Sequence, residues 1–180
     1  YDEEVNSDSD ELNLYLGAEM RSSSKLRGRV KLGYGEKDYD DKGLKDQDEW
    51  LAEAQLDYSF TPKTSAYLKG SRRVYEWDIS GSNGILSYRS QLGYRQRISS
   101  KLRCEMGLYY VDKEYDEPTT IGSKTAKRDD KDYGFIAALG FSPLRWLNLS
   151  LGYEYEERDS NFDSEDYSSN SFFLRLTAAL

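Results

Sequence analysis

Residues 12–21, LNLYLGAEMR, decide the fold that this sequence predicts. They place an apolar residue at every second position for ten positions, with polar or small residues between them. Because successive side chains of a β-strand point to opposite faces, this segment predicts a strand with one apolar face and one polar face. About 9 to 11 residues suffice for a tilted strand to cross a membrane, so the segment is long enough to span one.

The same alternation recurs along the chain in about nine segments. Two of them are weaker, residues 66–75 and 86–98, because Arg72 and Ser90 fall on the apolar face. The clear ones are residues 26–35, 50–60, 102–110, 133–141, 147–155 and 172–180. We predict an all-β protein, an antiparallel up-and-down transmembrane β-barrel, in a single domain of residues 1–180 whose residues 1–10 form an acidic outer segment.

The connections between these segments alternate between short and long. The short ones are residues 22–25, 61–64, 99–100 and 143–145, and the long ones are residues 36–49, 78–83, 112–132 and 157–170. Outer-membrane barrels have short periplasmic turns and long outer loops, whereas nothing in the physics of a soluble sandwich requires such alternation. The chain contains no run of about 18 apolar residues, which a membrane-spanning helix would need.

Aromatic residues make up 14% of the chain and fall near both kinds of connection. Membrane barrels carry girdles of Trp, Tyr and Phe where their strands cross the two interfaces. The predicted girdles consist of Tyr34, Trp50, Tyr58, Phe60, Tyr75, Trp77, Tyr88, Tyr94, Tyr110, Tyr133, Phe141, Trp146, Tyr153 and Tyr155.

The opposite face of the predicted strands is rich in charge. The short first turn places Glu19 opposite or diagonal to Arg27 or Arg29. Two interpretations stay open: a hydrated lumen whose charges select solutes, or ion pairs that fill a narrow barrel. The predicted lumen charges are Glu19, Arg21, Arg27, Arg29, Lys31, Glu53, Asp57, Lys69, Arg73, Arg89, Arg95, Arg97, Arg103, Glu105, Glu154, Glu156 and Arg175.

The composition argues against an enzyme. The chain has no histidine and one cysteine, Cys104, so Ser-His-Asp and Cys-His catalysis, histidine metal centres and cysteine zinc clusters are excluded. Glu154 and Glu156 could act as paired acids, but same-face carboxylates on a strand are more often solvated. We expect no cofactor, and the net charge of -8 argues against nucleic-acid binding.

Acidic clusters lie in the long connections. No segment fits an EF-hand loop, so we expect a solvated outer surface and no specific metal site, with calcium binding as the alternative. The clusters are Asp38, Asp40 and Asp41; Asp129, Asp130 and Asp132; and Asp159, Asp163, Glu165 and Asp166.

An odd number of strands leaves one edge without a partner, and an open edge in lipid leaves backbone groups unsatisfied. We expect either that the chain is the C-terminal part of a longer barrel, or that neighbouring copies pair through their edges.

The last predicted hairpin of the chain resembles that of a known class of proteins. Residues 151–155, LGYEY, the acidic connection up to Asn170, and residues 172–180, FFLRLTAAL, resemble the last hairpin of outer-membrane β-barrel porin families associated with exopolysaccharide export. The resemblance covers about 30 residues, and Leu180 stands where such assembly signals usually end in Phe. It implies a non-enzymatic conduit or scaffold in the outer membrane of a Gram-negative bacterium, with outer-membrane lipid, lipopolysaccharide and the barrel-insertion machinery as partners.

The leading functional prediction is a porin-like or export-associated channel with a charged lumen. The alternative is a structural barrel that self-assembles or mediates surface adhesion through its edges and acidic loops. A soluble β-rich protein would have to pack the same apolar residues inside a protein core.

Overall fold

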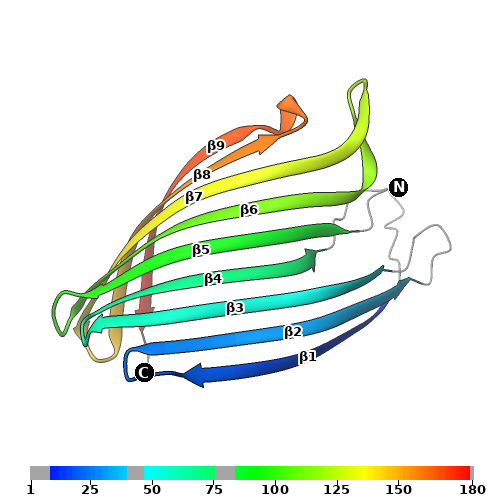
Figure 1. Ribbon diagram of the computed structural model, residues 1–180. Helices are drawn as coiled ribbons and strands as arrows, with labels where there is room; N and C mark the ends of the chain where they lie inside the picture. Colours follow the sequence, from blue (N-terminus) through cyan, green and yellow to red (C-terminus); the bar gives the residue numbers. More distant parts are fainter. Residues whose placement is uncertain (1–8, 40–46, 76–83, 179–180) are drawn as a thin grey trace.

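The computed structural model describes residues 9–39, 47–75 and 84–178, which form one antiparallel sheet and a short 3-10 helix (Figure 1). Each strand pairs with the next one along the chain. The elements are β1 (Ser9–Arg21), β2 (Leu26–Tyr39), β3 (Gln47–Thr61), β4 (Thr64–Tyr75), β5 (Ile85–Arg97), β6 (Leu102–Ile121), β7 (Lys124–Leu144), β8 (Leu147–Ser160), the 3-10 helix η1 (Asp163–Glu165) and β9 (Tyr167–Ala178). The predicted all-β, up-and-down architecture is confirmed, including the two weaker segments, β4 and β5.

The pairing register keeps the two chemical faces separate from strand to strand. Cα partners in an antiparallel pair point to the same side of the sheet, so Leu16 opposite Leu32 continues one face and Glu19 opposite Arg29 continues the other. The apolar face is open to its surroundings: Leu16 is 82% exposed and Phe172 is 78% exposed. A sheet that leaves its large apolar side chains uncovered needs another apolar phase against it.

The polar face is the concave one. The sheet curls along its width (Figure 1), and side chains on this face reach across an intervening strand. The hydroxyl of Tyr67 on β4 donates to Glu105 on β6 at 3.2 Å, and that of Tyr109 on β6 donates to Glu156 on β8 at 3.0 Å. Such contacts require that the strands bend toward one another on this side.

The strands are longer than the alternation predicted at one end of the sheet. The expected loop of residues 112–132 is wrong: β6 and β7 continue as a paired hairpin to a tight turn at Gly122, whose φ of 62° suits glycine. Residues 157–170 are also largely strand, with η1 between β8 and β9. Here both faces of the strands are polar, so the period-two signal is lost although the backbone pairing persists.

Parts of the predicted outer loops lie outside the described residues, including Asp40, Asp41 and Trp77. Of Asp38 the structure describes the backbone, which belongs to β2. Among the described helices, none is long and apolar enough to cross a membrane.

The sheet is not closed. Among the described residues β1 pairs with β2 alone, and β9 pairs with β8 alone. The two edge strands therefore each present one row of backbone groups that no other described strand bonds.

Candidate functional site

The concave face brings together the charged residues that the sequence predicted for a lumen. By register, all of them lie on this side of the sheet: Glu19, Arg21, Arg27, Arg29, Lys31, Glu53, Asp57, Lys69, Arg73, Arg89, Arg95, Arg97, Arg103, Glu105, Glu154, Glu156 and Arg175. Whether this side encloses a lumen depends on closure of the barrel, so the lumen itself stays a prediction.

Two acids on β1 to β3 are each shared between two cations. Glu19 lies 3.8 Å from Arg27 and 3.7 Å from Arg21, which confirms the expected diagonal pairing. Glu53 contacts both Lys31, at 3.8 Å, and Arg73. Asp57 instead pairs with Arg95 of β5 at 3.8 Å, so Glu19 and Glu53 are the two carboxylates here that each lie near two basic groups.

Aromatic rings on the concave face lie across glycines of the neighbouring strand. A Cβ atom added to Gly134 would lie 2.0 Å from Cζ of Tyr109, and one added to Gly93 would lie 2.1 Å from Cζ of Tyr67. The rings therefore occupy the space that a side chain would fill, which supports bent strands at close approach. The cross-strand pairs are Tyr15 with Gly33, Tyr67 with Gly93, Tyr109 with Gly134, and Phe173 with Gly152.

Glu154 and Glu156, the candidate paired acids, share one donor. The hydroxyl of Tyr109 lies 3.3 Å from Glu154 and 3.0 Å from Glu156, and Tyr167 also donates to Glu156. The pair is thus held in a hydrogen-bond network.

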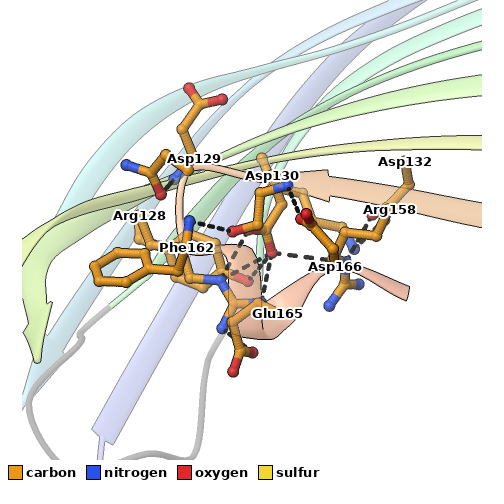
Figure 2. A network of polar contacts seen from close by, with 12 residues as sticks. Arg128, Asp129, Asp130, Asp132, Arg158, Phe162, Glu165 and Asp166 are labelled. Carbon is orange, nitrogen blue, oxygen red and sulfur yellow. Dashed lines mark hydrogen bonds and ion pairs between the residues drawn. The ribbon is translucent and has the colours of Figure 1, made fainter. Parts of the chain in front are cut away.

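A buried polar network lies on the concave face at the long-connection end (Figure 2). Asp130 is 0% exposed and receives hydrogen bonds from Arg128 at 2.7 Å, from Ser160 at 2.6 Å and from Tyr115 at 3.0 Å. Arg128 also reaches Glu165 of η1 at 2.6 Å. The network ties the β6–β7 hairpin to β8 and η1.

Asp130 lies beyond the apolar band, because its neighbours Asp129 and Lys131 place charges on the opposite face at this level. Burial by itself would raise the pKa of Asp130, but hydrogen bonds from Arg128 and Ser160 outweigh burial and lower the pKa below its ordinary value. The carboxylate of Asp130 is therefore ionised, and its oxygens accept hydrogen bonds from groups of the protein.

Asp132 continues this network toward the middle of the sheet. Arg158 donates to it at 2.8 Å, and Lys113 contacts its other oxygen. The predicted surface cluster of Asp129, Asp130 and Asp132 is wrong for its last two members, which are buried against cations. Among the described residues, no group of three or more His, Cys, Asp or Glu side chains is arranged to hold a metal ion.

The predicted girdle residues that the structure describes lie largely on the apolar face. The rings of Tyr110 and Tyr133 contact each other there at a tilt, with centroids 5.3 Å apart, and those of Tyr58 and Phe60 meet edge to face at 4.9 Å. Tyr75 is a correction: it pairs with Ile85 on the concave face, because β4 keeps strict alternation to its end.

Trp77 lies outside the described residues and Trp146 lies in the β7–β8 turn. The remaining predicted girdle residues share the apolar face by register: Tyr34, Trp50, Tyr88, Tyr94, Phe141, Tyr153 and Tyr155.

Arg72 is a charged residue on the apolar face, and its neighbours cover its guanidinium group. Its guanidinium carbon lies 4.2 Å from the ring centroid of Trp50 and 5.6 Å from that of Tyr88, and its Nη2 lies 2.5 Å from Glu49. Only 7% of the residue is exposed. Aromatic and acidic partners thus shield this charge from the apolar surroundings.

Comparison with known proteins gives a family and a fold. The model of the family described as "Putative beta-barrel porin 2" matches residues 1–180. A search of curated proteins found no match. Among solved structures, the alcaligin outer-membrane receptor FauA from Bordetella pertussis is similar with a TM-score of 0.66 and 13% identity, over 93% of this chain and 33% of that receptor. The likeness shows a shared fold, and the chain spans about a third of the receptor's length.

Proposed function

The chain belongs to this β-barrel porin family, and on that premise we propose that it forms the charged wall of an outer-membrane channel along which hydrated solutes pass. The observation that carries the proposal is the separation of the two faces: every predicted lumen charge lies on the concave side, and most of the large exposed apolar side chains lie on the other. A porin wall needs this arrangement, because lipid covers one face and water fills the other.

The open volume on the concave face favours a path filled with water over a face filled by ion pairs. Its depressions have volumes of about 260, 550 and 900 Å³, each large enough for several water molecules. We propose that the path serves export as well as passive flow, which the resemblance of the closing hairpin supports.

The proposal also requires closure. We propose that further strands pair with β1 and β9, because each has a single neighbour among the described residues and an open edge in lipid would leave its backbone groups unsatisfied.

Substituted cysteines test whether the concave face lines the conducting path. Cys104 is first replaced by serine, and single cysteines are then placed at Ser71 on the concave face or at Ser90 on the apolar face. Both positions lie in central strands, and Ser71 lines the depression of about 260 Å³. The purified protein is inserted into planar bilayers, and a charged, membrane-impermeant methanethiosulfonate reagent is added.

We expect the reagent to reduce single-channel conductance for Ser71→Cys and to leave Ser90→Cys unchanged. No conductance from a well-inserted barrel would refute the channel and favour the structural alternative, in which the edges and acidic loops act in assembly or adhesion. Equal block of both variants would refute the assignment of the faces.

A further inference from the structure

One depression on the concave face combines many basic side chains with little acid. It spans β2 to β5, has a volume of about 260 Å³, and lies at mid-height on the sheet. Glu53 is the only acidic residue among the described residues that line it, whereas its basic residues are Arg29, Lys31, Lys69, Arg73 and Arg89.

The single carboxylate is already engaged. Glu53 contacts Lys31 at 3.8 Å and Arg73 at shorter range, so its charge is divided between these two cations. Arg29, Lys69 and Arg89 form no ion pair with an acid of the described chain. Three positive charges in one depression repel one another, and an anion between them would remove that repulsion.

Aromatic rings hold two of these cations in place. Arg89 stacks on Tyr109 with its guanidinium carbon 4.4 Å from the ring centroid, and the Nζ atom of Lys69 lies 4.8 Å from the centroid of Tyr67. A guanidinium that lies over a ring keeps its in-plane N–H groups available to an anion, and these groups match the paired oxygens of a carboxylate or phosphate.

The approach to this depression from the short-turn end is also basic. A second depression of about 900 Å³ at that end is lined by Lys25, Lys63, Arg95, Arg97, Arg103 and Arg175. Glu105, the acid among its described lining residues, is 3.1 Å from Arg95. At the opposite end, Asp130 and Asp132 are matched by Arg128, Arg158 and Lys113. Positive potential therefore runs from the short turns to the middle of the sheet.

We propose that Arg29, Lys69 and Arg89 form a binding site for multivalent oxyanions, solutes that carry carboxylate or phosphate groups, which approach from the short-turn end. The proposal deepens the proposed function, because it rests on the concave face being open to water, and it names the sign and chemistry of the preferred solute. Carboxylate and phosphate solutes both present several negatively charged oxygen atoms. The binding experiment below distinguishes between these two classes of solute.

Equilibrium binding to the protein in neutral detergent micelles tests the site without requiring conduction. Citrate is the carboxylate probe, pyrophosphate is the phosphate probe, and spermidine is the cation control, all measured by titration calorimetry at low salt. The test variant is R29Q/K69Q/R89Q. The matched control, K101Q/K131Q/R145Q, removes the same charge at exposed positions outside the depression.

We expect the test variant to weaken binding of citrate, pyrophosphate or both by about tenfold or more, because each exposed cation contributes a modest share of affinity and three are lost. The control variant should change affinity by less than about twofold. Loss of citrate binding alone would identify a carboxylate site, and loss of pyrophosphate binding alone a phosphate site. Absence of binding by both anions, equal loss in both variants, or tighter binding of spermidine than of the anions would overturn the proposal.

The two proposals can fail separately. Circular dichroism and the heat-dependent gel shift establish that each variant is folded. Anion binding that depends on the three residues, in a protein that does not conduct, would uphold this site and refute the channel. Conductance without anion binding would uphold the channel and overturn the site.

Discussion

Leu92 offers the sharpest test of which face meets lipid. It lies on the apolar face of β5, is 55% exposed, and has Leu68 and Leu108 as its Cα partners on the two neighbouring strands. β5 is a central strand, so whatever pairs with the sheet edges does not touch it. The perturbation is Leu92→Arg, and its matched control is Gln91→Arg, which adds the same charge at the adjacent position on the concave face.

The expected loss of stability in Leu92→Arg depends on how deep residue 92 lies in the membrane. Leu92 is five residues from Arg97 at the end of β5, which is about 16 Å along the strand and about 13 Å along the membrane normal at a tilt of about 40°. The apolar band of outer-membrane barrels is about 25 Å tall, so Leu92 lies near its middle. An arginine at the midplane costs about 2–4 kcal/mol. Gln91→Arg loses the 3.1 Å hydrogen bond to Tyr67, which costs about 1 kcal/mol, and it sets a like charge opposite Lys69, which costs a few tenths of a kcal/mol more on this hydrated face.

Urea titration of the protein folded into phospholipid vesicles, followed by tryptophan fluorescence, measures the free energy of unfolding of both variants. Leu92→Arg should be less stable than Gln91→Arg by about 1–3 kcal/mol. Equal free energies of unfolding would mean that Leu92 does not face lipid, and the assignment of the two faces would fall.

Three further changes probe the packing around the site. Gly134→Ala should lower the free energy of unfolding by about 1–3 kcal/mol, because its Cβ would lie 2.0 Å from the ring of Tyr109; adding Tyr109→Ser should recover part of this loss, and strictly additive effects would contradict the contact. Asp130→Asn should cost about 3 kcal/mol at neutral pH, since it breaks a buried ion pair. The pKa of Asp130 is lowered in the folded state, so the wild type should keep the stability that the ion pair provides above about pH 4 and lose it as the pH falls further. If the wild type and Asp130→Asn lost stability in parallel on acidification, the ion pair would not provide it. Arg72→Lys should cost about 1 kcal/mol, because lysine cannot reproduce the stacked guanidinium; the same change in a Trp50→Leu background should cost less, and an unchanged cost there would exclude the stacking.

The two faces of the sheet were predictable from sequence because alternation is a local property of each strand. The ion pair between Glu19 and Arg27 followed from it too, since the short first turn fixes the register of β1 against β2. The same logic could have found Tyr15 opposite Gly33, which belongs to that hairpin. An aromatic residue facing a glycine on the polar face is the signal that was missed.

The buried network around Asp130 could not be predicted in this way. Arg128 comes from β7 itself, but Tyr115 comes from β6, Ser160 from β8 and Glu165 from η1, and the register of β6 against β7 shifts between Glu114 and Pro118. Pro118 is compatible with a bulge there, but the sequence does not fix which residues of β6 then face β7. The prediction for Tyr75 was wrong for a different reason: its place near a long connection suggested a girdle, although the alternation of β4 already puts it on the concave face.

Strand direction constrains what can close the barrel. Every described neighbour pair is antiparallel, so β1 and β9, separated by an even number of steps, run in the same direction. Direct pairing of β1 with β9, within one chain or between copies inserted the same way, would make a parallel pair in an otherwise antiparallel sheet. Antiparallel closure therefore needs an odd number of additional strands between β9 and β1. Cysteine pairs scanned between Leu16 on β1 and successive residues of β9 should therefore form no disulfide, whereas an efficient cross-link would show direct β1–β9 pairing, because adjacent strands lie about 4.8 Å apart.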